Sequence, residues 1–452
     1  MIGVALSVGA LVGTFVIARK SLVPGIVAAI AFGYAYGILR ANFFDTASHF
    51  IFDAAVLGLY VARIGDINRT FATAGCRHFK HWVTLLLAIP LVLFFVPMQD
   101  FMVQLVGLRA NAYLLPFLLI GAILTRHDWY RLALWLACLD VIAFLFGGAE
   151  YLLGVRRFFP YNAVTEIIYR SGDVGLGHNL RIPSVFGSSH VYGGTMVLTV
   201  PLLVSAWMQR RREIWQKNLL IAGLIAAILG VFMSAARLHF VVLVVLLTVA
   251  TLSTRMRPIY RVGWIVLLVV AGYVVGTQDR MQRFTTLDDT QYLQDRLNAS
   301  VNTTLFGVMI DYPFGNGLGA GGTSIPFFLA DRVHTPVAVE SEWGRIELET
   351  GWIGLVAWCG FLLWVFTRPQ PHRNDPAFLG WRLAWIAALC YFASGFIGIG
   401  LFTAIPQTAL LFMLVGWVAT HRAEQDDRFM HVPPPKMRPI SVGIPHRELA
   451  RR

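Results

Sequence analysis

The stretch from residue 218 to residue 253 is NLLIAGLIAAILGVFMSAARLHFVVLVVLLTVATLS. It contains two apolar runs, at 218–233 and 238–253, and the segment Ser234-Ala235-Ala236-Arg237 separates them. Each run approaches the length of about 20 mostly apolar residues that a helix needs to cross a bilayer. The stretch therefore predicts a hairpin of two transmembrane helices with an arginine at its turn.

The composition of the whole chain points to the same class of protein. Of 452 residues, 57% are hydrophobic and only 14% are charged, whereas an average soluble domain carries about 25% charged residues. These values exclude a soluble enzyme, a disordered protein and a small disulfide scaffold. We therefore expect an all-α, polytopic helical membrane protein. The net charge of +12 suits loops beside anionic membrane lipid, and we expect no nucleic-acid partner.

Further apolar runs are spread along the chain, and basic clusters occupy alternate gaps between them. Short basic loops stay in the cytoplasm, which predicts about 12–13 transmembrane helices with the N-terminus outside and the C-terminus inside. Residues 1–420 then form a single integral-membrane domain, and the proline-rich segment 421–452 is a disordered cytoplasmic tail. The thirteen runs are 2–18, 21–38, 47–62, 82–97, 110–125, 131–149, 190–208, 218–233, 238–253, 262–276, 347–367, 383–400 and 405–420.

Two long loops fall on the predicted external side, at about 150–189 and 277–346. External loops are normally poor in Arg and Lys, yet these two carry nine Arg and no Lys. A guanidinium binds phosphate through two parallel hydrogen bonds, whereas Lys offers a point charge. The loops therefore indicate a phosphate-bearing or acidic ligand at the outer leaflet. The alternative is ion pairing with nearby Asp side chains, which suits the second loop better than the first. The nine are Arg156, Arg157, Arg170, Arg181, Arg280, Arg283, Arg296, Arg332 and Arg345.

Arg237 and an acidic segment are the sharpest candidates for function. A charge at the end of a membrane helix either snorkels to the interface or binds a ligand, and we expect Arg237 to bind one. The segment 340–351 places Glu340 and Glu342 ahead of a helix expected to begin near residue 347. A carboxylate there is a candidate general base, although acidic residues in a first turn also complement the helix dipole. No metal-ligand spacing of His, Asp or Glu occurs in these loops, so we expect neither a metal nor a cofactor.

Four short motifs follow one another along the predicted external side. The first joins Arg181 to two pairs at the entrance of a helix, and the second is the turn that ends at Arg237. The third joins Arg296 to an apolar stretch and a glycine-rich turn, and the fourth is the entrance of a later helix. They are Arg181 with Phe186-Gly187 and Gly193-Gly194; Ser234-Ala235-Ala236-Arg237; Arg296, Leu305 to Ile310 and Asp311-Tyr312-Pro313-Phe314-Gly315-Asn316-Gly317-Leu318-Gly319; and Glu349-Thr350-Gly351-Trp352-Ile353-Gly354.

In this order the motifs resemble those of the O-antigen ligase and O-antigen polymerase superfamily of bacterial envelope glycosyltransferases, over about residues 110–420. The resemblance implies a GT-C-like fold in the bacterial inner (cytoplasmic) membrane, with the active site facing the periplasm. It also implies a polyprenyl-diphosphate-linked oligosaccharide donor, a saccharide acceptor and metal-independent transfer. The family's ligases usually carry a His-Asn pair where this chain has Glu340-Ser341, and this departure favours a polysaccharide polymerase.

We therefore predict polymerisation of a cell-surface or exported polysaccharide. Arg181, Arg237, Arg296 and Arg345 are expected around the diphosphate; Glu340 is the first candidate for the base, and His334 is the second. Two alternatives stay open. One is an O-antigen-type ligase, which moves a finished glycan to a lipid or protein acceptor. The other is a transporter or flippase for lipid-linked sugars, which would place ionisable groups along a path through the membrane.

Overall fold

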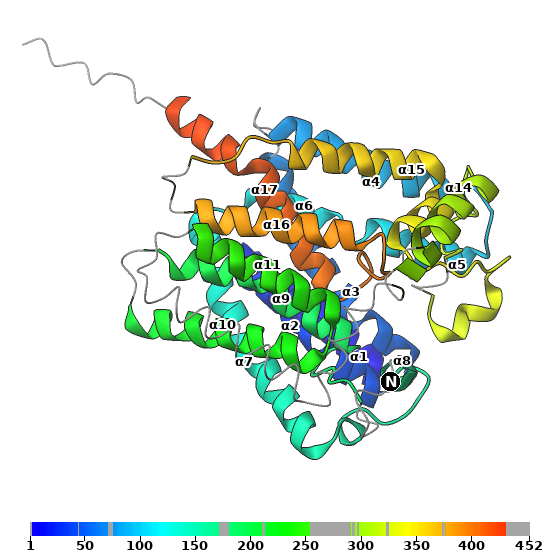
Figure 1. The fold of residues 1–452 in the computed structure, drawn as a ribbon, viewed down its shortest axis with the longest axis horizontal. Coiled ribbons are helices and arrows are strands. Elements are labelled where there is room, and N and C mark those ends of the chain that lie inside the picture. Colours follow the sequence, from blue (N-terminus) through cyan, green and yellow to red (C-terminus); the bar gives the residue numbers. More distant parts are fainter. Residues whose placement is uncertain are drawn as a thin grey trace, which may run out of the picture.

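The structure is a computed structural model, and all regular elements among the residues it describes are helices (Figure 1). These are residues 2–43, 45–70, 76–170, 180–209, 213–253, 291, 294–295, 298–321, 325–372, 375 and 377–430. Within them, the first half contains α1 (Ile2–Lys20), α2 (Leu22–Asn42), η1 (Thr46–Phe50), α3 (Ile51–Thr70), α4 (Arg77–Leu93), α5 (Phe101–Ala112), α6 (Pro116–Ile123), α7 (Arg126–Leu153), η3 (Val155–Arg157), α8 (Glu166–Arg170) and α9 (Ser189–Trp207). The second half contains α10 (Ile214–Ser234), α11 (Arg237–Ser253), η5 (Asn298–Phe306), α14 (Gly307–Asp311), η6 (Phe327–Arg332), α15 (Glu342–Phe366), α16 (Phe378–Ser394) and α17 (Gln407–Met430).

Eight helical segments of the described chain are long and apolar enough to cross a membrane, and three shorter apolar helices accompany them. The predicted polytopic helical class is therefore confirmed. Twelve of the thirteen predicted runs overlap helices, and the run at 262–276 lies outside the described residues. The count of about 12–13 spans stays a prediction.

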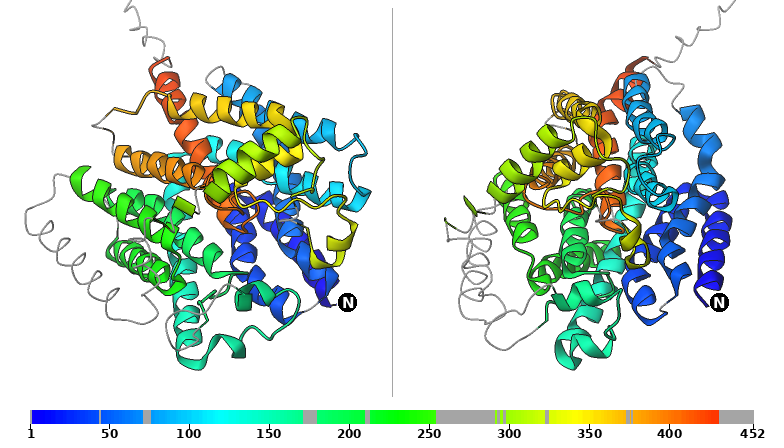
Figure 2. Two further views of the ribbon diagram at one scale, coloured as in Figure 1. Left: turned by 45° about the vertical axis from the view of Figure 1, so that its right-hand side comes forward. Right: turned by 90° about the vertical axis from the view of Figure 1, so that its right-hand side faces the viewer.

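Helix α9 lies at the centre of the bundle. It packs against α7, α10, α11, α16 and α17, and 89% of its apolar window is buried, compared with 22% for α1. Small residues let these helices approach closely, as at Gly380, whose Cα has no room for a side chain beside Ser205 of α9. Figure 2 shows α1 at the edge of the bundle. Helix α1 leaves Ile2, Val4 and Val8 uncovered, as expected for a lipid-facing helix.

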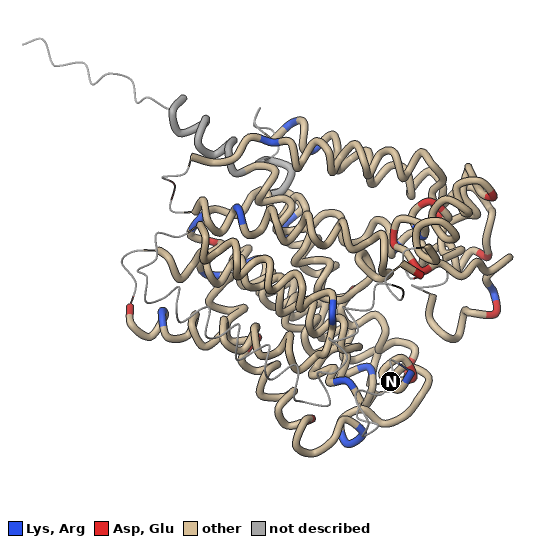
Figure 3. Tube along the Cα trace, viewed as in Figure 1, with Lys and Arg blue, Asp and Glu red and all other residues tan. Residues whose placement is uncertain are grey.

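The two predicted external loops lie toward one end of the bundle. Helix α8 belongs to the first loop and α14 to the second, and both lie on the right in Figure 1, where the described chain also begins. The C-terminal part of α17 runs to the opposite end. Charged residues gather mainly at the two ends (Figure 3). This arrangement fits a bundle that stands across a membrane with both loops on the same side.

Two helix boundaries differ from the prediction. Helix α15 begins at Glu342 and not near residue 347, because Ser341 caps it by accepting a hydrogen bond from the amide of Gly344 at 3.0 Å. Helix α17 continues to Met430, past the expected start of the tail at residue 421. Residues 421–430 are mostly good helix formers, and no proline occurs between residue 421 and Pro433. The rest of the predicted tail, 431–452, lies outside the described residues.

Candidate active site

Arg181 and the turn at Ser234 come together, although they lie far apart in the sequence. Arg181 is buried, and its Nε and Nη2 both donate to the backbone oxygen of Ser234 at 3.3 Å. Its Nη1 lies 3.0 Å from Nε2 of His190, in the first turn of α9. The guanidinium therefore joins the entrance of α9 to the hairpin between α10 and α11.

The predicted helical hairpin is present, and its turn is tight. Helix α10 ends at Ser234, Ala235 adopts a left-handed conformation with φ +48°, and α11 begins at Arg237. The hydroxyl of Ser234 accepts a hydrogen bond from the amide of Ala236 at 3.3 Å. Arg237 is partly buried in the first turn of α11. Whether Arg237 binds a ligand or snorkels stays open at this point.

The glycine pair on α9 lets the hairpin approach. A Cβ atom at Gly193 would lie 2.5 Å from the hydroxyl oxygen of Ser234 and 3.3 Å from Nδ1 of His239. A Cβ atom at Gly194 would overlap the side-chain amide of Gln407. The first two motifs, predicted from order alone, are therefore in direct contact.

His239 is a buried polar residue that was not among the predicted site residues. It lies on α11, 5% exposed, and its ring centroid is 6.3 Å from that of His190 and 5.7 Å from that of Tyr391. In the described part of the chain, its Nδ1 atom has no hydrogen-bond partner. An ionisable residue inside an apolar run is a functional candidate by default, so its position two residues after Arg237 was a usable signal.

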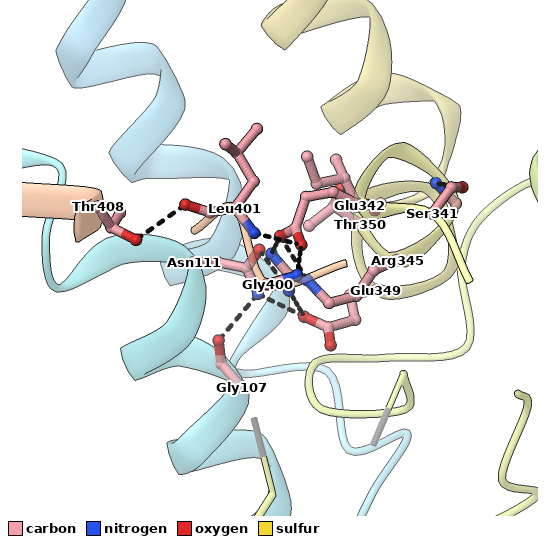
Figure 4. Close-up of polar contacts among 12 residues, drawn as sticks. Gly107, Asn111, Ser341, Glu342, Arg345, Glu349, Thr350, Gly400, Leu401 and Thr408 are labelled. Atoms are coloured by element: carbon pink, nitrogen blue, oxygen red, sulfur yellow. Dashed lines mark hydrogen bonds and ion pairs between the residues drawn. The ribbon is translucent and has the colours of Figure 1, made fainter. Parts of the chain in front are cut away.

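Arg345 lies at the centre of a second polar cluster, at the entrance of α15 (Figure 4). Its Nε and Nη2 donate to Oε1 of Glu342 at 2.9 and 2.7 Å, and its Nη1 donates to Oε2 of Glu349 at 2.7 Å. All three side chains are buried. A direct contact between Arg345 and a diphosphate would have to replace these ion pairs, so we infer that Arg345 acts as a positioning residue.

The Arg345 cluster joins three distant parts of the chain (Figure 4). Asn111 on α5 donates to Oε2 of Glu349 at 2.5 Å. Oε2 of Glu342 accepts hydrogen bonds from the amides of Gly400 at 2.6 Å and Leu401 at 3.1 Å. The segment that begins at Gly400 continues to Gln407, which packs against the glycine pair of α9. Residues 400–407 therefore connect the Arg345 cluster to the Arg181 contact.

The two candidate bases do not belong to this cluster. Glu340 and His334 are both exposed. The backbone of His334 is held by Gln99, whose Oε1 accepts from its amide at 2.8 Å and whose Nε2 donates to its carbonyl at 3.1 Å. Glu340 directly precedes Ser341, the N-cap of α15. Both assignments stay predictions.

Glu347 is a buried carboxylate that also attracts notice. Both of its carboxylate oxygens are buried, and neither has a hydrogen-bond partner within the described ranges. The alternative interpretation, that acidic residues of a first turn complement the helix dipole, would have suited Glu347 and Glu349 if the helix began near residue 347. Glu349 instead pairs with Arg345. Because α15 begins earlier than predicted, Glu342 lies inside its first turn and not ahead of the helix.

The glycine-rich turn is packed onto the kink of α15. Gly315, Gly317 and Gly319 have φ values of +81°, +90° and +86°, which favour glycine. The amide of Asn316 donates to the carbonyl of Leu348 at 2.6 Å. Gly351, at φ +66°, interrupts the helical backbone where the turn contacts it. The turn therefore fixes the helix entrance.

Of the predicted site residues, Arg296 lies outside the described residues. In the described part of the chain, no group of three or more His, Cys, Asp or Glu side chains is arranged to hold a metal ion. Compared with protein-family models and with curated proteins, the chain matches none. The resemblance to the O-antigen ligase and polymerase superfamily therefore remains a proposal.

Proposed function

We propose that the protein polymerises a cell-surface or exported polysaccharide by glycosyl transfer from a polyprenyl-diphosphate-linked donor. The observation that carries the proposal is the contact of Arg181 with Ser234, which joins two arginine-bearing motifs at one end of the bundle. A buried guanidinium beside a second arginine at a helix hairpin suits the diphosphate of a lipid carrier. The finer features belong to the same proposal: a GT-C-like architecture in a bacterial inner membrane, with the site facing the periplasm.

The proposed reaction needs two kinds of group. The acceptor hydroxyl oxygen attacks the anomeric carbon, the bond from that carbon to the diphosphate oxygen breaks, and the lipid diphosphate leaves with the bonding electrons. Arg181, Arg237 and Arg296 would stabilise the leaving diphosphate, and Glu340 or His334 would take the hydroxyl proton. The Arg345 cluster holds the entrance of α15, and therefore the adjacent Glu340, in a fixed position.

The direct test is a reconstituted reaction. Purified protein in proteoliposomes is incubated with a polyprenyl-diphosphate oligosaccharide, and the lipid-linked products are separated by length. Longer lipid-linked chains together with free lipid diphosphate support polymerisation. Transfer of an unlengthened glycan to a lipid or protein acceptor would instead identify a ligase. No transfer to any saccharide, lipid or protein acceptor would refute a glycosyltransferase.

Transport is a second candidate function, and one observation favours it. Asp140 lies in the middle of α7, is fully buried, and accepts a hydrogen bond from the hydroxyl of Tyr34 at 2.7 Å. Ionisable groups at this depth mark transport paths and proton relays. If the protein is a transporter, proteoliposomes should move a lipid-linked sugar between leaflets, and Asp140→Asn should stop that movement. A glycosyltransferase should lengthen chains without moving them.

A further inference from the structure

Arg40 lies in the last turn of α2, beside the entrance of α9. The amide of Ile38 donates to the carbonyl of Val185 at 3.0 Å. A Cβ atom at Gly37 would overlap the backbone of Phe186. One terminal nitrogen of Arg40, Nη2, lies 3.7 Å from the place where a Cβ atom would stand on Gly187. The guanidinium therefore lies against the segment that leads into α9.

Within the described residues, Arg40 has no carboxylate partner. Its Nη1 donates to the hydroxyl of Tyr36 at 3.3 Å, and its guanidinium lies 5.1 Å from the centre of that ring. Its Nε is buried and makes no hydrogen bond to any described part of the chain. Arg109, at the same end of the bundle, is by contrast paired in bidentate fashion with Asp53 at 2.7 and 2.9 Å. A partly buried guanidinium without an anion is unfavourable unless a ligand supplies one.

The first turn of α9 offers groups that complement an anion. Its leading amides lack partners within the helix, and its dipole favours negative charge. Ser188 caps the turn and accepts from the amide of Val191 at 3.4 Å. The hydroxyl of Ser189 is buried and has no hydrogen-bond partner among the residues that the structure describes. His190, next in the turn, contacts Arg181, so Arg40 and Arg181 flank this helix entrance.

We propose that Arg40 and Ser189, with the first turn of α9, bind one phosphate group of the lipid diphosphate next to Arg181. This inference rests on the proposed function, because it assigns part of the same donor. Arg40 lies outside the motifs that carry the resemblance, and Ser189 lies between Phe186-Gly187 and Gly193-Gly194 of the first motif. A phospholipid headgroup offers the same phosphate chemistry, so the test includes both sources.

The test measures binding without sugar transfer. Full-length protein is placed in phosphatidylcholine nanodiscs, and undecaprenyl diphosphate and inorganic pyrophosphate are titrated separately; a parallel set of nanodiscs contains phosphatidylglycerol. Arg40→Lys keeps the charge and loses the planar fork. Arg19→Lys is the matched control, because Arg19 also ends a helix and lies over the ring four residues before it, Phe15, at 5.5 Å. Ser189→Ala is a second, milder variant.

We expect Arg40→Lys to raise the Kd for both diphosphates about 10-fold or more. Ser189→Ala should raise it in the same direction, and Arg19→Lys should leave it unchanged. Unchanged Kd values in both Arg40→Lys and Ser189→Ala overturn the proposal, as does a change confined to phosphatidylglycerol. A protein that binds diphosphate through Arg40 but makes no polymer refutes the proposed function and keeps this site. Normal polymer synthesis by Arg40→Lys, together with unchanged Kd values for both diphosphates, refutes this site and keeps the proposed function.

Discussion

The guanidinium of Arg345 shows how much a single buried residue can determine. It neutralises Glu342 and Glu349, and removing it would leave two buried carboxylates without a counter-charge. Breaking a buried pair by deleting one partner typically destabilises a protein by about 3–5 kcal/mol. Glu342 also holds the amides of Gly400 and Leu401, so the same change would release the segment that leads to Gln407.

We therefore expect Arg345→Ala to lower the free energy of unfolding in detergent by about 3–5 kcal/mol. The matched control is Arg170→Ala, which removes an exposed pair with Glu166 that has the same i,i+4 spacing as Arg345 with Glu349. Exposed pairs contribute about 0–1 kcal/mol. Equal effects of the two substitutions on chemical unfolding curves would show that burial does not strengthen the Arg345 cluster.

Arg237 tests the difference between binding and snorkelling. Arg237→Lys should reduce polymer synthesis about 10- to 150-fold, because Lys cannot donate two parallel hydrogen bonds to a diphosphate. Arg382→Lys serves as the control, since Arg382 donates to Ser253 at 3.2 Å, at the end of α11 away from Arg237. Near-normal synthesis by Arg237→Lys in a protein that inserts normally would identify Arg237 as a snorkelling residue.

The base is tested by a pair of substitutions. Glu340→Gln keeps the shape of the side chain and removes its basicity, so polymer growth should fall about 10²- to 10⁴-fold while the lipid-linked donor still binds. His334→Ala should have the milder effect. Loss of activity in His334→Ala alone would move the assignment to His334. Activity in both variants would mean that neither side chain acts as the base.

Among the helices, α15 shows the clearest difference between the predicted and the observed helix start. The spacing of Glu342, Arg345 and Glu349 already contains the i,i+3 and i,i+4 pairs of a helix. They were not predicted because the helix start was placed where hydropathy rises, near residue 347, and the charged first turns resembled a loop. The bond from Asn111 could not be foreseen, because its partners lie more than 200 positions apart.

The apolar runs were predictable because each must bury its backbone polar groups in a helix when it lies in lipid. Arg40 and Arg109 were not predicted as site residues, because each lies just outside the end of an apolar run and no pattern distinguishes it there. The order of the motifs suggested that Arg181 and the turn at Ser234 lie close together. No local pattern links residues so far apart in the sequence. Only the folded arrangement shows that their contact includes a backbone oxygen.

The kink of α15 gives a prediction at the scale of the element. Gly351 has φ +66° and ψ −179°, and a Cβ atom there would lie 2.7 Å from the backbone carbon of Phe314. Gly351→Ala should therefore destabilise the protein by at least about 1–3 kcal/mol and impair activity. Gly148→Ala on α7 is the control, because a Cβ atom there meets nothing within 4 Å. Thermal unfolding and the polymer assay together measure both effects.

For the whole molecule, the arrangement of both loops at one end makes a topology prediction. In a variant without native cysteines, Thr303→Cys, exposed on η5, should react with an impermeant thiol reagent in intact spheroplasts. Gln209→Cys, in the gap after α9, should react only after permeabilisation. The opposite labelling would place the Arg181 contact in the cytoplasm and contradict an outer-leaflet donor.

The Arg345 cluster also has a consequence for the history of the chain. Because loss of Arg345 alone would leave two buried carboxylates without a counter-charge, its replacement by itself passes through an unstable intermediate. Lineages should therefore retain the triad together or exchange it together, for instance for a set of apolar residues of similar volume. Asn111, on a helix distant in the sequence, should change in step with Glu349. An alignment of true relatives should show these positions covarying, while the neighbouring exposed Glu340 varies independently of them unless catalysis preserves it.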